Sequence, residues 1–462
     1  MSKAEANSGT PQILVRETAG VCSMCMKKVP AQVRVRDGHV HLIKSCPQDG
    51  ETSQLLSRHP AFWTELDRFY FQVNGDEHPQ RDYIVRMTEK CNLDCPICLA
   101  RANTLETPDF DLSGLETFLS QRRGIKIDLM AAEPTLREDL EDWIRKVKAG
   151  GNIAALHTNG LRLANRAYAE RIKAAGVDEV FLQFDGFDDE ANTRLRGRPL
   201  LEQRLAALAN LRALGIATSL IVVIARGVNE EEVHKTFRFA LRPENDHIRE
   251  VFFLGLRLLG SARDALGSGE SAVASQQLMP DELIDLLVDQ EPEISREDVH
   301  RFNLLYFALL SAFRVKKCLY VQHYLVVRNG GGGYQPIADV MDLAALADAA
   351  RHYSTRRAAH PTAAKAALLA ALARQGVSRR ALKMTGDFLK LEHLFQSGMN
   401  LGRVPRRFLL LGFITACDPH NFDAQVAINC GKGELSVDGG FHESSAEANV
   451  EREARVQHGR EV

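Results

Sequence analysis

The chain has 462 residues, and its 45% hydrophobic and 26% charged content suits a globular protein of about two to four domains or a large α/β barrel. Its 58 Lys and Arg against 60 Asp and Glu leave a formal net charge of −2, which argues against a broad nucleic-acid-binding surface. No apolar run reaches the ~18 residues of a membrane helix, and the amino terminus lacks the apolar core of a secretory signal, so we expect a cytoplasmic protein.

The first 52 residues divide into a polar tail and a small cysteine-containing module. Residues 1–11 are polar, and we expect them to be disordered. Residues 12–52 carry a Cys22-x2-Cys25 pair, alternating residues typical of a hairpin, and then Cys46 in a Cys-Pro-Gln-Asp-Gly turn. A unit this small cannot build a sufficient apolar core, so the pattern predicts a module held together by a metal ion.

Short apolar strands alternate with helices over residues 82–262, which follow an aromatic connector at 53–81. We expect strands, separated by helices, at 83–87, 126–130, 153–156, 179–184, 216–224 and 250–254. Strand–helix units of about 30 residues form parallel sheets with right-handed crossovers. The sequence therefore predicts an α/β fold with a partial (β/α)6 barrel, whose ligands bind at the carboxyl ends of the strands.

The regular alternation ends after residue 262. Helices are expected at 279–289, 304–313 and 341–373, and strands at 320–327 and 408–415. Together they predict a C-terminal α+β domain over residues 263–442. Residues 443–462 are rich in charge, and we expect a disordered tail there.

Three of the nine cysteines share one loop after the first barrel strand: Cys91, Cys95 and Cys98, with C-x3-C-x2-C spacing. Three thiolates can each bind one iron of a [4Fe–4S] cube and leave the fourth iron open to a cofactor or substrate. A structural zinc site would use a fourth protein ligand instead. An odd cysteine count without a secretory signal also favours metal ligation over a disulfide framework.

This spacing resembles that of the radical S-adenosylmethionine (SAM) superfamily, and the polar motifs at later strand ends resemble it as well. The resemblance implies that SAM is held by residues at successive strand ends: Ala131, Ala132, Glu133, Pro134, Thr158, Asn159, Gln183, Asp185, Val222 and Gly227. Ala131 and Ala132 stand where the family usually has glycines. Ile97, often aromatic in the family, is expected to pack near adenine. Asp185 is expected to act in catalysis by contacting the ribose or positioning a reacting group.

The resemblance also implies the chemistry. SAM bound at the open iron would be cleaved reductively to methionine and a 5′-deoxyadenosyl radical, which abstracts hydrogen from an unactivated carbon. An electron donor such as flavodoxin or ferredoxin would reduce the cluster.

The N-terminal module makes the chain most similar to the group that contains archaeal tetraether lipid synthase and 7,8-dihydro-6-hydroxymethylpterin dimethyltransferase. This resemblance implies a rubredoxin-like site in which Cys22, Cys25 and Cys46 bind one iron or zinc ion. Asp49 replaces the usual histidine of this group and is the candidate fourth ligand.

Three scattered cysteines follow the barrel: Cys318, Cys417 and Cys430. Similar enzymes carry an auxiliary iron–sulfur cluster in this region, and these three thiols are candidates to hold one. The alternative is that they are buried packing thiols, because free cysteine is among the most buried residue types.

Three functions remain open from the sequence. The leading one is C–C bond formation or alkylation at an unactivated carbon, on a lipid chain. The alternatives are a methylase of a pterin or other small heterocycle, and a catalytically inactive metal-binding scaffold. We expect a small-molecule or lipid substrate and no nucleic acid, and the basic residues within 351–365 leave peripheral membrane association open.

Overall fold

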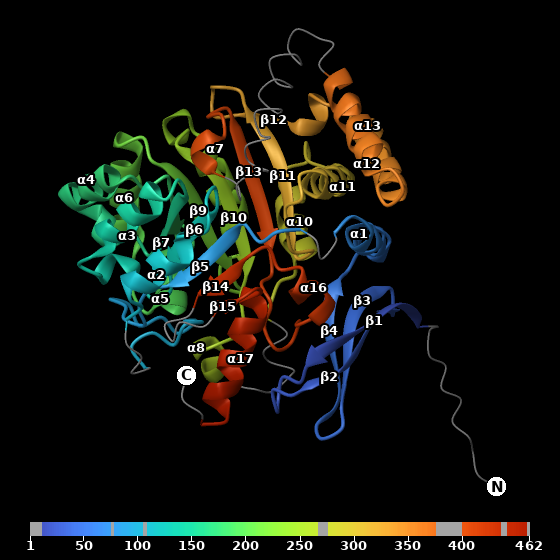
Figure 1. The fold of residues 1–462 in the computed structure, drawn as a ribbon, viewed down its shortest axis with the longest axis horizontal. Coiled ribbons are helices and arrows are strands. Elements are labelled where there is room, and N and C mark those ends of the chain that lie inside the picture. Colours follow the sequence, from blue (N-terminus) through green and yellow to red (C-terminus); the bar gives the residue numbers. More distant parts are fainter. Residues whose placement is uncertain are drawn as a thin grey trace.

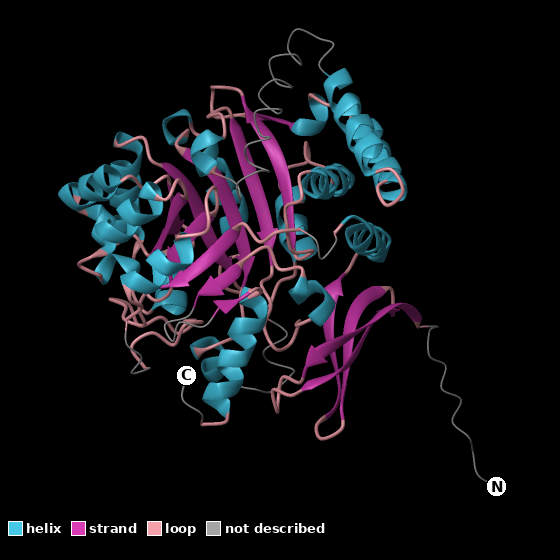
Figure 2. Cartoon of the chain, in the orientation of Figure 1, coloured by secondary structure: helices cyan, strands magenta, loops and turns pink. Residues whose placement is uncertain are grey.

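The computed structural model describes residues 12–74, 78–104, 109–266, 276–375, 400–435 and 441–459. These residues form a four-stranded antiparallel module beside an eleven-stranded sheet that carries most of the helices (Figures 1 and 2). The tail expected at 1–11 lies outside the described residues. Among the described helices, none is both long enough and apolar enough to cross a membrane.

The N-terminal module is an antiparallel sheet with its strands in chain order: β1 (Ile13–Val21), β2 (Lys28–Arg36), β3 (His39–Cys46) and β4 (Gly50–Ser57). β4 extends the module to Ser57, beyond the expected boundary at residue 52. The expected connector forms α1 (Pro60–Val73), which buries Trp63 and Tyr70. The buried Lys44 ammonium joins the module to the barrel, because it donates to the carbonyls of Val21 at 3.0 Å and Pro419 at 2.6 Å.

Six parallel strands are neighbours in chain order: β5 (Asp82–Arg86), β6 (Lys126–Met130), β7 (Ile153–Thr158), β8 (Glu179–Gln183), β9 (Ala217–Ile224) and β10 (Ile248–Gly255). The helices between them are α2 (Leu112–Leu119), α3 (Leu140–Ala149), α4 (Arg166–Ala175), α5 (Asp189–Arg196), α6 (Leu201–Ala213) and α7 (Glu232–Leu241). The predicted α/β partial barrel is therefore confirmed.

The C-terminal region extends the same sheet at both edges. Next to β10 lies the parallel strand β13 (Phe408–Ile414), followed by the antiparallel β11 (Val321–Arg328) and β12 (Tyr334–Pro336). At the other edge, β14 (Gly433–Leu435) runs parallel to β5 and pairs with β15 (Phe441–His442). The region expected as a separate α+β domain thus shares one sheet with the barrel.

The remaining helices surround this extended sheet: α8 (Ser261–Leu266), α10 (Pro280–Val288), α11 (Arg296–Ala312), α12 (Leu343–Arg356), α13 (Pro361–Arg374), α16 (Ala424–Ile428) and α17 (Ser445–Gln457). Short 3₁₀ turns lie at Pro134–Leu136, Arg162–Ala164, Pro243–Asn245, Ile337–Asp339 and Leu401–Arg403.

The expectation of a disordered charged tail was wrong for residues 445–457, which form α17. Ser444 caps this helix by accepting a hydrogen bond from the Glu447 amide. The buried Glu453 carboxylate pairs with Arg101 at 2.6 Å and with Arg263 at 3.2 Å. Paired charges can be buried, so the high charge content of this segment does not keep it unfolded.

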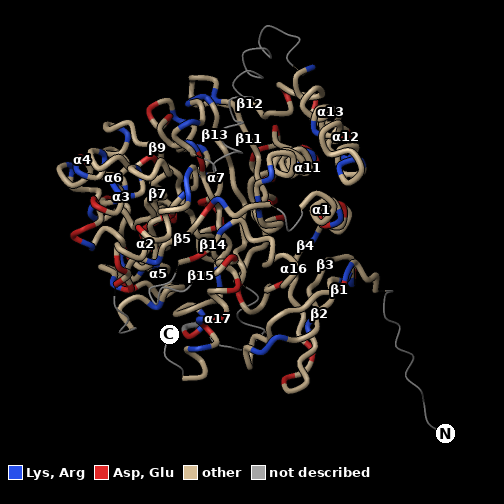
Figure 3. The backbone as a smooth tube through the Cα atoms, viewed as in Figure 1, with Lys and Arg blue, Asp and Glu red and all other residues tan. Residues whose placement is uncertain are grey.

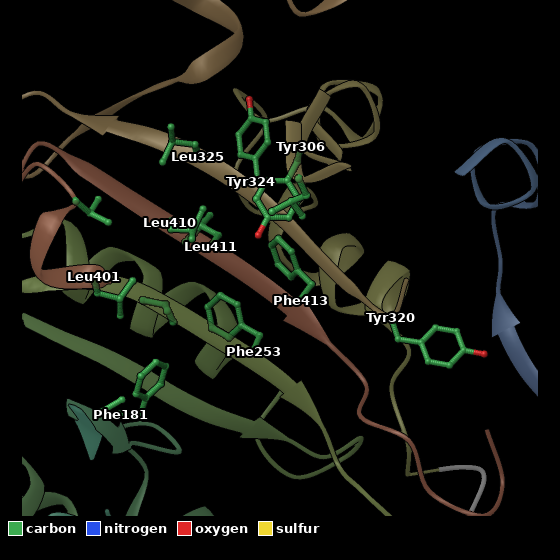
Figure 4. Close-up of a cluster of buried hydrophobic side chains, with 14 of the residues drawn as sticks. Phe181, Phe253, Tyr306, Tyr320, Tyr324, Leu325, Leu401, Leu410, Leu411 and Phe413 are labelled. Carbon is green, nitrogen blue, oxygen red and sulfur yellow. The ribbon is translucent and has the colours of Figure 1, made fainter. Parts of the chain in front are cut away.

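The two faces of the barrel sheet differ in accessibility. Side chains on the outer face, including Leu129, Val222 and Phe253, are fully buried at 0% exposure. Figure 4 shows the part of this core around β10 and β13, where the rings of Phe253 and Phe413 lie 5.9 Å apart. Several inner-face side chains are partly exposed instead, such as Met130, His157, Gln183, Val223 and Phe252. The inner face is therefore the one that a small molecule can reach. Over the described part of the chain, positive and negative residues are interspersed (Figure 3).

Candidate active site and metal sites

Four candidate ligand atoms converge at the end of the N-terminal module, from Cys22, Cys25, Cys46 and Asp49. All four lie within 4.8 Å of one another. The Asp49 Oδ2 atom is 3.1 Å from the Cys22 Sγ and 3.3 Å from the Cys46 Sγ, while the Sγ atoms of Cys25 and Cys46 are 3.7 Å apart. Two turns bring them together, one after β1 and one between β3 and β4.

Three thiols and one carboxylate suit a single tetrahedral ion. Burial raises the pKa of Cys22 to about 12, whereas hydrogen bonds from the three thiols lower the pKa of Asp49. A divalent cation would take the place of these thiol protons. The structure thus places Asp49 where the sequence expected the fourth ligand.

The Cys91–Cys98 loop follows β5. Two glycines, Gly197 and Gly260, allow neighbouring segments to pack closely against it. A side chain at Gly260 would overlap the carbonyl oxygens of Cys98 and Leu99, and a Cβ at Gly197 would lie 3.1 Å from the Asp94 oxygen. Both glycines have positive φ, at 60° and 84°. The loop is therefore packed closely against segments that follow α5 and β10.

The three thiols of this loop are spread more widely than the N-terminal ligands, because their sulfur atoms do not all lie within 4.8 Å of one another. A cube that binds each cysteine through a different iron needs such a spread, whereas a single ion does not. Burial raises the pKa of Cys91 to about 12 and also raises that of Cys95. Buried thiols of this kind become thiolates when metal is bound.

Glu133 ties the ends of β6 and β7 together. It is fully buried, and its carboxylate accepts hydrogen bonds from the Thr135 hydroxyl at 2.6 Å, the Thr158 hydroxyl at 2.7 Å and the Asn159 amide at 2.8 Å. The Asn159 side chain then donates to Asn92 Oδ1 at 2.7 Å and lies 3.9 Å from the Cys91 sulfur. The structure thus joins the β6 and β7 motifs to the cysteine loop, while Glu133 as a direct SAM ligand stays a prediction.

Ala131 and Ala132 adopt backbone conformations that favour glycine. Their φ angles are +77° and +38°. A left-handed residue with a Cβ costs roughly 1–2 kcal/mol, so this segment holds strain at the end of β6. The family that the sequence resembles usually has glycines here, so this chain differs in the side chains but keeps a glycine-like backbone. Pro134 is buried in the 3₁₀ turn that follows.

Asp185 is fully occupied by partners within the protein. Arg196 donates to it from Nε at 2.7 Å and from Nη2 at 2.9 Å, and Arg204 and the Val223 amide each donate at 3.1 Å. The same Arg196 guanidinium contacts the thiol of Cys95. In this structure Asp185 therefore positions Arg196 against the cysteine loop, and its direct catalytic role stays a prediction.

Val222, which was expected to help hold SAM, does not lie on the inner face of the barrel. Val222 points to the outer face and is fully buried, so the structure does not bring it to the site. Its neighbour Val223 is partly exposed and packs in one small apolar cluster with Ile97 and Val228. Gly227 is exposed beside this cluster with φ of +70°. Gln183 faces the same side and accepts from Arg204 at 3.2 Å.

The inner face of the barrel carries charged side chains that sequence reasoning missed. Lys126 pairs with Glu179, and Lys432 pairs with Asp128 and lies 3.2 Å from Asp82. The Nε2 atom of His157 is 3.3 Å from an Asp128 oxygen. Burial and the charge of Lys126 lower the pKa of His157 to about 3, so its imidazole is neutral. Charged residues inside strands that read as buried could have signalled this lining.

The three C-terminal cysteines gather near the buried Tyr70. The thiols of Cys318 and Cys417 are in hydrogen-bonding contact, which together with burial raises the pKa of Cys417. All three cysteines lie close enough to the phenol of Tyr70 to contribute, after burial, to raising its pKa. Segments separated by about a hundred residues are thereby brought to one place. Like the barrel loop, these thiols do not all lie within 4.8 Å of one another.

Comparison with known proteins matches two parts of the chain to families. Residues 85–240 match the Radical SAM superfamily, and residues 14–58 match the HMPTM N-terminal zinc ribbon domain. The 7,8-dihydro-6-hydroxymethylpterin dimethyltransferase of Methanocaldococcus jannaschii is 28% identical over 317 residues, covering 62% of this chain and 61% of that protein. The probable GTP 3′,8-cyclase of Pyrococcus abyssi is 28% identical over 165 residues, covering 35% of this chain and 53% of that protein.

The chain therefore spans about three fifths of the first relative and about half of the second. Among solved structures, Streptococcus suis SuiB bound to its precursor peptide SuiA shows 12% identity and a TM-score of 0.39, over 61% of this chain and 71% of that chain. That likeness is too low to carry an argument.

Proposed function

Because the chain is a radical SAM enzyme with an N-terminal zinc-ribbon module, we propose that it methylates a pterin or another small polar heterocycle. The observation that carries this proposal is the charged inner face of the barrel. The side chains of Lys126, Asp128 and Glu179 are buried on the inner face and paired with one another, so the floor of the barrel below the strand ends is charged rather than apolar. Apolar chains gain nothing from desolvating charges, whereas polar heterocycles can hydrogen-bond to them.

The relationship to the pterin dimethyltransferase supports the same substrate class. We therefore favour the methylase alternative over C–C bond formation or alkylation on a lipid chain. A catalytically inactive scaffold is disfavoured, because the three barrel cysteines and the segments that support their loop are all in place.

Cys91, Cys95 and Cys98 would hold the [4Fe–4S] cluster, and SAM would lie between the β6 end at Ala131–Ala132 and the cluster of Ile97 and Val223. When bound, cluster and SAM together supply hydrogen-atom abstraction from carbon. The protein's own part is to orient the substrate on the inner face and to exclude water from the reacting carbon. Asn159 donates to Asn92 of the cysteine loop, and Arg196, which Asp185 holds, lies beside Cys95 of the same loop.

Two further metal centres belong to this proposal. The N-terminal site, with three thiols and Asp49, fits zinc. Cys318, Cys417 and Cys430 would hold an auxiliary [4Fe–4S] cluster, and the support for this assignment is that all three lie near Tyr70. Reduction would come from a carrier such as flavodoxin or ferredoxin.

The proposal is tested with anaerobically reconstituted full-length protein, SAM, a reductant and separate pools of pterins and of membrane lipids. One SAM molecule supplies the 5′-deoxyadenosyl radical and a second one supplies the methyl group. We expect 5′-deoxyadenosine to form faster with a pterin, together with S-adenosylhomocysteine and a product one methylene heavier by mass spectrometry. Stimulation by lipid alone would overturn the substrate class. The Cys95→Ala variant is the control, because it lacks one cluster ligand and should give none of these products.

A further inference from the structure

The deepest layer of the inner face contains a carboxylate and an imidazole with unused hydrogen-bonding atoms. Glu250 on β10 and His323 on β11 are 1% and 0% exposed. Within the part of the chain that the structure describes, Glu250 Oε1 and both ring nitrogens of His323 have no hydrogen-bond partner. The Nε2 atom of His323 is 4.0 Å from that same Oε1, which is too long for a direct hydrogen bond.

Both side chains are held firmly in position. The Ser219 hydroxyl donates to the other Glu250 oxygen at 2.9 Å. Asn303 of α11 holds the His323 backbone on both sides, donating to its carbonyl at 2.9 Å and accepting from its amide at 2.8 Å. A buried polar atom without a hydrogen bond normally lowers stability by about 1–3 kcal/mol. A rigid pair of such side chains therefore indicates that a bound molecule supplies the missing hydrogen bonds.

The surroundings suit a flat ring. Phe252 is partly exposed on the same face, and its ring lies 5.6 Å from that of His323 in an edge-to-face arrangement. A Cβ at position 412 would overlap the Phe252 ring. Glycine at this position therefore leaves room for that ring. Burial raises the pKa of Glu250 to about 7, despite the charge of Lys126 and the hydrogen bond from Ser219. A ligand N–H that donates to Oε1 would stabilise the ionised carboxylate.

We propose that Glu250 and His323 form the recognition site for the donor-bearing edge of a planar heterocycle, which lies against Phe252. The inference rests on the proposed function and identifies the residues that recognise the substrate. Glu250 accepts from the exocyclic amino group of the ring, and His323 bonds a neighbouring polar atom of the same edge.

The test compares pterin with lumazine, which carries a carbonyl oxygen in place of the 2-amino group. Binding to the reconstituted full-length protein is measured by ligand fluorescence. We expect wild type to prefer pterin by about tenfold or more, and Glu250→Gln to reduce this preference to about threefold or less. The matched control is Glu291→Gln, a buried carboxylate beyond the end of α10 that accepts from Arg238 at 2.6 Å and from Tyr334 at 2.9 Å, and this variant should keep the preference.

His323→Phe provides a second variant, because phenylalanine keeps the packing against Phe252 but removes both ring nitrogens. It should weaken pterin binding by about tenfold. The SAM-perturbed EPR signal of the cluster verifies that each variant is folded. If wild type binds no pteridine, the proposed function fails and this inference with it. Pterin binding and preference that are unchanged in both variants, or a wild type that binds both ligands equally, overturn the inference alone.

Discussion

Arg196 and Asp185 form a buried two-pronged ion pair, with Nε–Oδ2 and Nη2–Oδ1 distances of 2.7 and 2.9 Å. The same guanidinium contacts the Cys95 thiol. The pair therefore links the end of β8 to the cluster loop. Loss of one partner of a buried pair leaves the other charge uncompensated. This lowers the free energy of unfolding by more than the intact pair contributes to it.

Asp185→Asn should lower the free energy of unfolding by about 3–5 kcal/mol and reduce the iron bound at the barrel loop. Chemical unfolding and iron analysis check this. Asp188→Asn is the control: Asp188 caps α5 through its side chain, asparagine caps equally well, and stability should change by less than about 0.5 kcal/mol. If Asp185→Asn keeps its stability and iron but loses SAM cleavage, then Asp185 contacts cofactor or substrate directly and the positioning role is wrong.

Ala131→Gly and Ala132→Gly should each stabilise the protein by about 0.5–1 kcal/mol, because glycine adopts positive φ without the steric cost of a Cβ. Thermal unfolding of the protein measures the change. Ala154→Gly, in β7 and fully buried, is the matched control and should destabilise. Destabilisation by the glycines at 131 and 132 would show that their methyl groups make contacts worth more than the backbone strain.

Asp49→Ala should weaken zinc binding by the N-terminal module at least about tenfold, because it removes one of four ligands. Competition with a chromophoric chelator measures the affinity. Asp49→Cys should restore it, and Glu51→Ala, an exposed acidic change nearby, should leave it as in wild type. Equal affinity in Asp49→Ala would mean that another group supplies the fourth ligand.

Changing Cys318, Cys417 and Cys430 together to Ala should remove about half of the cluster iron while the SAM-perturbed EPR signal remains. The reason is that these thiols lie outside the barrel loop and converge on Tyr70. Iron and acid-labile sulfide analysis decides it. Unchanged iron would show that the three residues are packing thiols.

The arrangement of the six barrel strands and the grouping of the cysteines could be predicted from sequence. Each strand–helix unit is formed by residues close in sequence, and the C-x3-C-x2-C spacing by itself indicates a cluster-binding loop. Asp49 was also placed correctly beside the thiols, because it lies only three residues from Cys46 in the same turn.

Long-range pairing could not be predicted. β13 enters the sheet beside β10 more than 150 residues later in the chain, and no local pattern encodes that neighbour. The Val222 error arose because strands buried on both faces show no alternation, so the sequence does not say which of Val222 and Val223 points inward. The occupied carboxylates of Glu133 and Asp185 likewise depend on partners from other strands.

The central claim is that this chain acts as a radical SAM enzyme on a small polar heterocycle inside the barrel. The most direct measurement is the rate of 5′-deoxyadenosine formation with a reduced pterin, compared with a lipid extract and with no substrate, with product masses recorded in parallel. The account predicts a rate increase and a methylated product with the pterin alone. A rate increase with the lipid extract and none with any pterin would contradict it.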